Sequence, residues 1–392
     1  RECESYVPRL LDIPVEHRRQ LRERGEVVLD VEETTKDERE ELQRRYFTTS
    51  PRPVLDLLDS PYTNRLVLLG DPGAGKSCLL RWYSLQSIDA IISSNGDAKG
   101  RFPFFVELKE YSRWIPNNGG KSYFRFWAES DSQYKIPEEV TLDYIDRCDG
   151  AIVLFDGLDE IFDPQIRRDV VRTIVNFGID HPNAKLVITS RIYGFDEAPF
   201  RNSGFQVFML QEFEQEQIDT FLNRWHSYAF VDERERIMKQ DRIRQSLRNS
   251  ARIRELAGNP LLLTMMAILN RRQELPRDRA MLYNKCADVL LDLWQTEGRQ
   301  LVDAFPELRE QGIDTQDKRA ILQAVAWHMQ TVGEKATNLI HETDLEKIIA
   351  RYLHSERGFT NPKRLAQALV RELREINFTL CAMGAGTYAF VH

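Results

Sequence analysis

Residues 70–77 combine glycines, a lysine and a hydroxyl residue at a spacing that suits phosphate binding. They have the form G-x-x-x-x-G-K-[ST], in which glycines let the backbone turn with its N–H groups facing an anion. Lys76 supplies a positive charge for the β- and γ-phosphates of a nucleotide, and Ser77 supplies a hydroxyl ligand for Mg²⁺. The predicted phosphate-binding residues are Gly70, Asp71, Pro72, Gly73, Ala74, Gly75, Lys76, Ser77 and Cys78.

A second group of charged residues follows the apolar run AIVLF. Asp156, at the end of that run, is placed to hold Mg²⁺ opposite the phosphate loop. Asp159 and Glu160 come one short turn later, where a carboxylate can orient and polarise a water for attack on the γ-phosphate. An acidic surface loop is the alternative. We favour the site because the run lies about eighty residues beyond the phosphate loop.

Arg191 ends another apolar run, KLVITSR. In P-loop proteins with a catalytic carboxylate of this kind, this strand lies between the phosphate-loop strand and the Asp156 strand. That order places Arg191 near the γ-phosphate, where a charge-assisted contact distinguishes tri- from diphosphate. A solvent-facing arginine is the alternative. The predicted catalytic residues are Lys76, Asp159, Glu160 and Arg191, and the predicted metal ligands are Ser77 and Asp156.

Five apolar segments must position these residues: 66–69, 102–108, 151–155, 185–189 and 206–210. Each is nearly continuous in apolar character, and helix-length spans separate them. This pattern is typical of parallel strands that are covered on both faces. It predicts an α/β doubly wound sheet, in which ligands bind beyond the carboxyl ends of the strands.

After Gln211 the strand signals stop and helical periodicity takes over. One apolar stripe is Ile218, Phe221, Leu222, Trp225 and Tyr228. Residues 232–255 are polar and Arg-rich with interleaved acids, which predicts a solvated face. Three amphipathic helices and a hairpin, 378–381 with 388–391, end the chain. They predict a winged helix.

Composition limits the class of protein. The chain has 392 residues, 42% hydrophobic and 29% charged, which is typical of a globular protein with about two or three domains. A net charge of −7 argues against a dominant polyanion-binding surface. Five scattered cysteines without a C-x-x-C pair fit a reducing cytosol, and no apolar run is long enough for a membrane helix. We therefore expect a cytoplasmic protein without membrane contact, and we expect this chain to be a fragment of a longer one.

With these motifs in order, the chain resembles the NACHT family of STAND nucleotide-switch ATPases, a branch of the AAA+-like P-loop NTPases. The resemblance spans about residues 60–392, from GDPGAGKS through LFDGLDE, ITSR and GNPLLLTMMAIL to TYAFVH. Its most specific motif is DGLDE, in which Gly157 stands beside the metal-binding Asp156 and precedes the acidic pair.

The resemblance implies more than the residue patterns do. Pro260 matches the proline that packs on adenine, and His392 matches the histidine that contacts the β-phosphate of ADP in the closed state. The implied domains are a lead-in at 1–60, a NACHT domain at 61–210, a helical domain at 211–300 and a winged-helix domain at 313–392. The implied cofactors are ATP or ADP with Mg²⁺.

The resemblance also implies a slow ATPase that is closed with ADP and self-associates with ATP. Effector and sensor modules would lie elsewhere in the parent chain, and bacterial members often serve in defence or programmed-death signalling. An AAA+ motor acting on nucleic acid or protein, and a scaffold that binds nucleotide for stability only, remain alternatives. The acidic charge and the lack of a basic stripe on the last helices count against nucleic acid. Adenine is favoured because no N-K-x-D motif for guanine is present.

Overall fold

The structure, a computed structural model, describes residues 6–7, 51–93, 101–118, 126, 138–147, 151–161, 163–192, 195–276, 278–300, 311–331, 339–375, 380–384 and 386–390. The chain divides into two compact units, Arg1–Gln211 and Glu212–His392. Most of the predicted lead-in falls outside the described residues. No helix in the described ranges is both long and apolar enough to cross a membrane.

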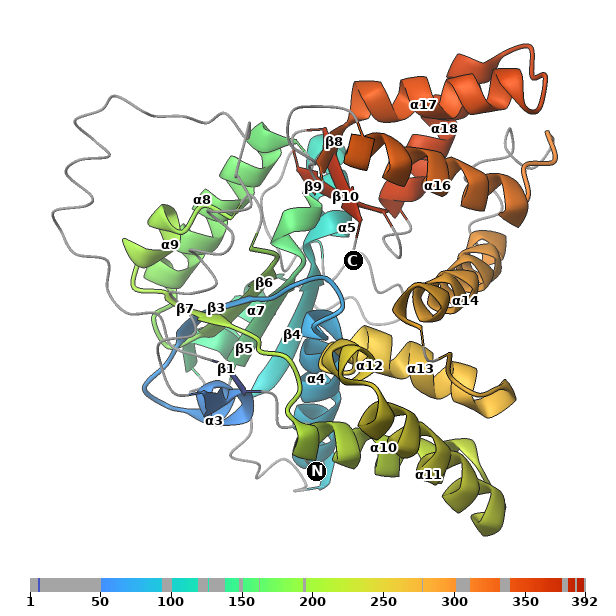
Figure 1. Cartoon of the computed structure of the whole chain (residues 1–392). Coiled ribbons are helices and arrows are strands. Elements are labelled where there is room, and N and C mark those ends of the chain that lie inside the picture. Colours follow the sequence, from blue (N-terminus) through green and yellow to red (C-terminus); the bar gives the residue numbers. More distant parts are fainter. Residues whose placement is uncertain are drawn as a thin grey trace, which may run out of the picture. The chain divides into compact units, whose positions relative to one another are not determined.

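A five-stranded parallel sheet forms the centre of the first unit (Figure 1). Its strands are β3 (Arg65–Leu69), β4 (Phe102–Glu107), β5 (Ala151–Asp156), β6 (Lys185–Ser190) and β7 (Gln206–Met209). Their order is β4-β5-β6-β3-β7, and each neighbouring pair is parallel. The predicted parallel α/β sheet is confirmed, and β6 lies between β3 and β5 as the sequence analysis expected.

Alternate strand residues pack against helices on opposite faces of this sheet. On β3, Leu66 and Leu68 face the side covered by α3 (Val54–Asp59) and α4 (Lys76–Ser93). Val67 and Leu69 face the other side. The helices that contribute to that side are α5 (Leu108–Asn118), α7 (Glu138–Arg147), α8 (Pro164–Asp180) and α9 (Ala198–Arg201). Burial on both faces explains why the strands lack a polar alternation.

The short helix α3 is joined to the sheet by a buried lysine. Lys185, the first residue of β6, is fully buried, and its ammonium donates to the carbonyls of Leu57 (3.0 Å), Leu58 and Ser60 (2.9 Å). Just before α3, β2 (Arg52–Pro53) pairs with β1 (Tyr6–Val7) in an antiparallel ladder. The segment that leads into the sheet is thereby tied to β6.

Helices make up the first part of the second unit: α10 (Gln215–Ala229), α11 (Glu233–Asn249), α12 (Ala251–Leu256), α13 (Pro260–Arg272) and α14 (Arg279–Gln300). Ile218 and Leu222 of the predicted stripe lie in their shared core. Tyr228 is 90% exposed, so the stripe ends before it, because ten residues beyond Ile218 the helix has turned that position toward solvent.

The second part contains α16 (Thr315–Thr331), β8 (Leu339–His341), α17 (Glu342–Ser355), α18 (Pro362–Glu375), β9 (Leu380–Gly384) and β10 (Thr387–Phe390). The predicted hairpin is present as β9 and β10. A third strand, β8, was not predicted and pairs with β10 in the order β8-β10-β9. It is only three residues long, which is too short for an alternating pattern to be recognised in the sequence.

Candidate functional site

The loop between β3 and α4 has the backbone conformation that its glycines predict. Gly73 and Gly75 have φ angles of 76° and 87°, in the left-handed region that favours glycine. A Cβ atom on Gly75 would meet nothing within 4 Å. Glycine is therefore favoured at this position by its backbone conformation and not by a lack of space. The Gly70 N–H donates to the Ser190 carbonyl at 3.2 Å, which connects the start of the loop to the end of β6.

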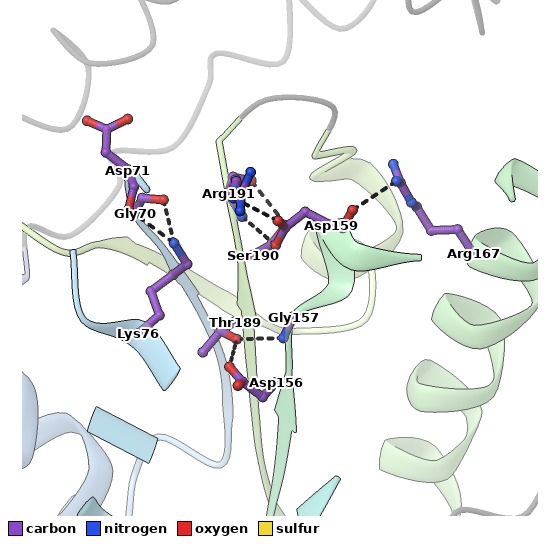
Figure 2. A network of polar contacts seen from close by, with 10 residues as sticks. All are labelled: Gly70, Asp71, Lys76, Asp156, Gly157, Asp159, Arg167, Thr189, Ser190 and Arg191. Carbon is purple, nitrogen blue, oxygen red and sulfur yellow. Dashed lines mark hydrogen bonds and ion pairs between the residues drawn. The ribbon is translucent and has the colours of Figure 1, made fainter. Parts of the chain in front are cut away.

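Lys76 begins α4 and folds over the loop (Figure 2). Its ammonium donates to the carbonyls of Gly70 at 2.8 Å and Asp71 at 3.2 Å. Burial lowers the pKa of Lys76, the Asp159 charge opposes that shift most strongly, and the Arg191 charge adds to it. The amino end of α4, which carries a partial positive charge, also lies at this loop. Cys78, the third residue of α4, is exposed.

Asp156 is fixed by a neighbour on the adjacent strand. The hydroxyl of Thr189 donates to Asp156 Oδ1 at 2.5 Å and accepts the Gly157 N–H at 2.9 Å. Burial raises the pKa of Asp156, and hydrogen bonds from the Thr189 and Ser77 hydroxyls oppose the shift. The two predicted metal ligands, Ser77 and Asp156, are therefore side by side. Thr189 was not predicted; its only sequence signal is its place two residues before Arg191.

Gly157 makes room for the side chain of Glu160. Its φ angle is 79°, and a Cβ atom there would lie 3.2 Å from Glu160 Cδ and Cγ and 3.3 Å from Oε1. A single 3-10 turn, η1 (Leu158–Glu160), follows Gly157. Burial, and next the Asp159 charge, raise the pKa of Glu160 to about 7, while Lys109 and Arg191 oppose the shift. A carboxylate of this kind accepts a proton readily at neutral pH.

Both carboxylate oxygens of Asp159 bind Arg191. Oδ1 accepts the Arg191 backbone N–H at 3.0 Å, and Oδ2 pairs with Nε at 3.0 Å. Asp159 and Arg191 are 6% and 8% exposed, so solvent screens this ion pair little. The two residues of the predicted acidic pair therefore have different contacts. Asp159 orients Arg191, whereas Glu160 contacts Gly157.

A further arginine, which the sequence did not single out, contacts the same turn from α8. Arg167 Nε donates to the Ile161 carbonyl at 2.8 Å. Its Nη2 donates to the Asp159 carbonyl at 3.3 Å, as Figure 2 shows. Burial lowers the pKa of Arg167, and the Asp159 charge opposes that shift. A lone arginine on an amphipathic helix gives no sequence signal for such a contact.

The other two predicted nucleotide contacts, Pro260 and His392, belong to the second unit. Pro260 is the first residue of α13 in the second unit, and the side chain of the preceding Asn259 accepts the N–H groups of Leu261 and Leu262. Its contact with adenine stays a prediction. His392 lies outside the described residues. Asn284 and Asp288, which resemble a guanine-specificity motif at the wrong spacing, both contact Arg319.

The residues present fit Mg²⁺. Among the described residues, no three His, Cys, Asp or Glu side chains gather into a metal-binding group of their own. Mg²⁺ prefers a few hard oxygen ligands combined with phosphate oxygens and water. Ser77 and Asp156 supply two such oxygens next to the phosphate loop, and Thr189 holds one of them in place.

The parallel sheet, its phosphate loop and the carboxylates at the end of β5 define the class of this protein as a P-loop ATPase. The sequence model of the NACHT domain matches residues 64–229, which extend from β3 into α10. This stretch is a NACHT domain, so the chain contains a P-loop NTPase module of the NACHT type.

Solved structures with a similar arrangement come from several organisms. They include a Walker-type ATPase of Pyrococcus abyssi, with 15% identity, 86% of this chain and 91% of that chain covered, and a TM-score of 0.36. The ORC1 protein of Aeropyrum pernix in complex with DNA is 16% identical, with 93% of this chain and 91% of that chain covered and a TM-score of 0.40. AMPPCP-bound DnaA from Aquifex aeolicus is 9% identical, with 83% of this chain and 85% of that chain covered and a TM-score of 0.32. No curated protein sequence matches the chain.

Proposed function

We propose that the chain is an ATP-dependent molecular switch that is closed with ADP and opens and self-associates when ATP replaces ADP. Slow hydrolysis returns it to the closed state. One observation carries the nucleotide chemistry: the carboxyl ends of β3, β5 and β6 bring together Lys76, Asp156, Glu160 and Arg191. The switch itself is supported by the NACHT domain and by the resemblance to STAND ATPases.

Each residue of the cluster has a distinct task in this proposal. Lys76 and the loop N–H groups bind the β- and γ-phosphates. To do so, the Lys76 ammonium gives up its hydrogen bonds to the Gly70 and Asp71 carbonyls and donates to phosphate oxygens instead. Ser77 and Asp156 hold Mg²⁺, which, when bound, neutralises charge on the phosphate oxygens. Glu160 orients the attacking water and accepts its proton. Arg191, held by Asp159, contacts the γ-phosphate.

The experiment that tests this site is nucleotide binding by Lys76→Ala. Because that variant lacks the charge that meets the phosphates, we expect it to lose measurable ATP and ADP binding in calorimetric titration. Arg168→Ala is a suitable control, since Arg168 is exposed and contacts Gln165 on its own helix. ATP binding by Lys76→Ala with the affinity of the unmodified chain would contradict the assignment.

The nucleotide carried by the purified chain distinguishes a switch from a motor. A protein that rests with ADP is expected to release stoichiometric ADP when it is denatured, and chromatography of the supernatant identifies it. An empty site with fast turnover would instead favour an AAA+ motor. In the switch, Pro260 packs on adenine and His392 contacts the β-phosphate of ADP, so His392→Ala is expected to speed ADP release.

We further propose that the parent protein acts in the cytoplasm, with effector and sensor modules outside this chain, in defence or programmed-death-type signalling. The support is the resemblance of the DGLDE and GNP motifs to that family. Expression of the parent protein with and without Lys76→Ala tests this role. Loss of a growth or protection phenotype only in the variant is the expected result.

A second candidate, action on a nucleic acid, is favoured by the exposed face of α18. Between residues 363 and 373, where the side chains of α18 are described, the exposed ones are Lys363, Arg364, Gln367 and Arg371. Glu372 of the same helix is buried and pairs with Lys318 at 2.9 Å. These basic side chains support the candidate, against the expectation that the last helices carry no basic stripe. Salt-dependent binding of duplex DNA that Lys363→Glu with Arg364→Glu abolishes would support this candidate.

A further inference from the structure

The guanidinium of Arg167 binds the two backbone carbonyls on either side of Glu160. The acceptors are the carbonyl of Asp159, which precedes Glu160, and that of Ile161, which follows it. The contact comes from the first turns of α8, whereas Glu160 ends η1. One rigid group thus connects a helix on one face of the sheet to the peptide unit directly before Glu160 and to the one that follows Ile161.

We infer that Arg167 is a positioning residue for ATP hydrolysis, which sets the orientation of the Glu160 side chain by fixing the backbone on both sides of it. This inference rests on the proposed role of Glu160. It adds a residue that neither the phosphate loop nor the DGLDE motif contains.

The turn that carries Glu160 needs such support. It contains two backbone hydrogen bonds, from Glu160 N–H to the Gly157 carbonyl at 3.0 Å and from Ile161 N–H to the Leu158 carbonyl at 3.3 Å. A single 3-10 turn that starts from a left-handed glycine has little rigidity of its own. The planar fork of an arginine constrains two acceptors at once, which a lysine cannot do with the same geometry.

The alternative is that Arg167 only stabilises the start of α8. That start is already capped: Asp163 Oδ1 accepts the N–H groups of Gln165 at 2.8 Å and Ile166 at 2.9 Å, and Pro164 occupies the first turn. Because the helix has its own cap, the two bonds from Arg167 to the preceding turn act on the turn rather than on the helix.

The test combines single-turnover ATP hydrolysis with nucleotide binding. Arg167→Gln is expected to lower the hydrolysis rate roughly 10- to 100-fold, since small misplacements of a catalytic group have effects of this size. The dissociation constant for ATP should not change, because Lys76 and the phosphate loop are untouched. Arg168→Gln, the exposed neighbour on α8, is the matched control and should hydrolyse ATP at the unmodified rate.

A second measurement separates positioning from general loosening. Hydrogen exchange of a peptide that spans residues 157–161 should become faster in Arg167→Gln and stay unchanged in Arg168→Gln. In the double variant with Glu160→Gln, Arg167→Gln should cause no further loss of rate, because the residue acts through Glu160.

Three results would overturn the inference: an unchanged rate in Arg167→Gln, a rate loss of equal size with and without Glu160, or slow hydrolysis explained entirely by weaker ATP binding. The proposed function fails separately. If Glu160→Gln alone hydrolyses ATP at the unmodified rate, the catalytic role of Glu160 is wrong. If Glu160→Gln is slow while Arg167→Gln is normal, only the positioning role is wrong.

Discussion

Glu160 and Asp159 are neighbours in the chain, yet their surroundings give them different chemistry. Asp159 is bound through both oxygens to Arg191, so its carboxylate holds that arginine in place. Glu160 lies against Gly157, and burial raises its pKa to about 7. Two adjacent carboxylates with different environments are a common way to separate a charged positioning group from a proton acceptor.

The raised pKa of Glu160 predicts how hydrolysis depends on pH. A general base acts only when it is deprotonated, so the single-turnover rate should rise with pH and level off above an apparent pKa near 7. The measurement is the rate between about pH 5.5 and 9 at saturating ATP and Mg²⁺. Glu160→Gln should give a lower rate without that rise. A rise of the same midpoint in Glu160→Gln would show that another group titrates.

Thr189 predicts a specific defect in metal use. Thr189→Val keeps the shape of the side chain but removes one of the two hydroxyl donors to Asp156 and leaves the Gly157 N–H without its acceptor. An unpaired buried group costs about 1–3 kcal/mol, and a less fixed Asp156 should bind Mg²⁺ more weakly. We expect hydrolysis to need a higher Mg²⁺ concentration in Thr189→Val. Thr189→Ser, which keeps the hydroxyl, should restore the original requirement.

At the scale of elements, β6 connects two places that the sequence shows as unrelated. At its start, Lys185 holds the carboxyl end of α3. At its end, Thr189, Ser190 and Arg191 contact Asp156, Gly70 and Asp159 in turn. Burial lowers the pKa of Lys185 to about 7, and the partial negative charge at the carboxyl end of α3 opposes that shift. The strand therefore joins the segment before the sheet to the site.

Replacement of Lys185 should destabilise the first unit strongly. Lys185→Met keeps much of the apolar stem but leaves three carbonyls without their donor, at a cost of about 3 kcal/mol or more. Denaturant unfolding followed by circular dichroism measures the loss. Lys347→Met is the control, because the Lys347 side chain is 71% exposed and its pairing with Asp344 contributes little. Equal stability of both variants would contradict a structural role for Lys185.

At the scale of the whole molecule, the proposed switch predicts a change of association state. The chain with ADP should be monomeric, and the chain with a non-hydrolysable ATP analogue should form a larger assembly, as measured by size-exclusion chromatography with light scattering. Arg191→Ala should bind the analogue yet stay monomeric, since its contact distinguishes tri- from diphosphate. Identical mass with both nucleotides would contradict the switch and leave the ATPase assignment intact.

The sequence alone determined the parallel α/β sheet, the phosphate loop and the order of the strand-end motifs. Each of these is encoded locally: apolar runs of strand length, glycines at loop positions, and a lysine followed by a hydroxyl residue at fixed spacing. The position of β6 between β3 and β5 was expected from the strand order of P-loop proteins with a catalytic carboxylate, and it is confirmed.

Only the tertiary structure decided how the charged groups share their tasks. Thr189 reaches Asp156 across 33 residues of sequence, Asp159 meets the Arg191 backbone across 32, and Lys185 reaches Leu57 across 128. Such contacts arise because parallel strands bring distant segments into register, and no local pattern records which partner a buried polar group finds. The motifs predict where the nucleotide binds. The packing of β3, β5, β6 and α8 decides which carboxylate is held and which is left beside Gly157.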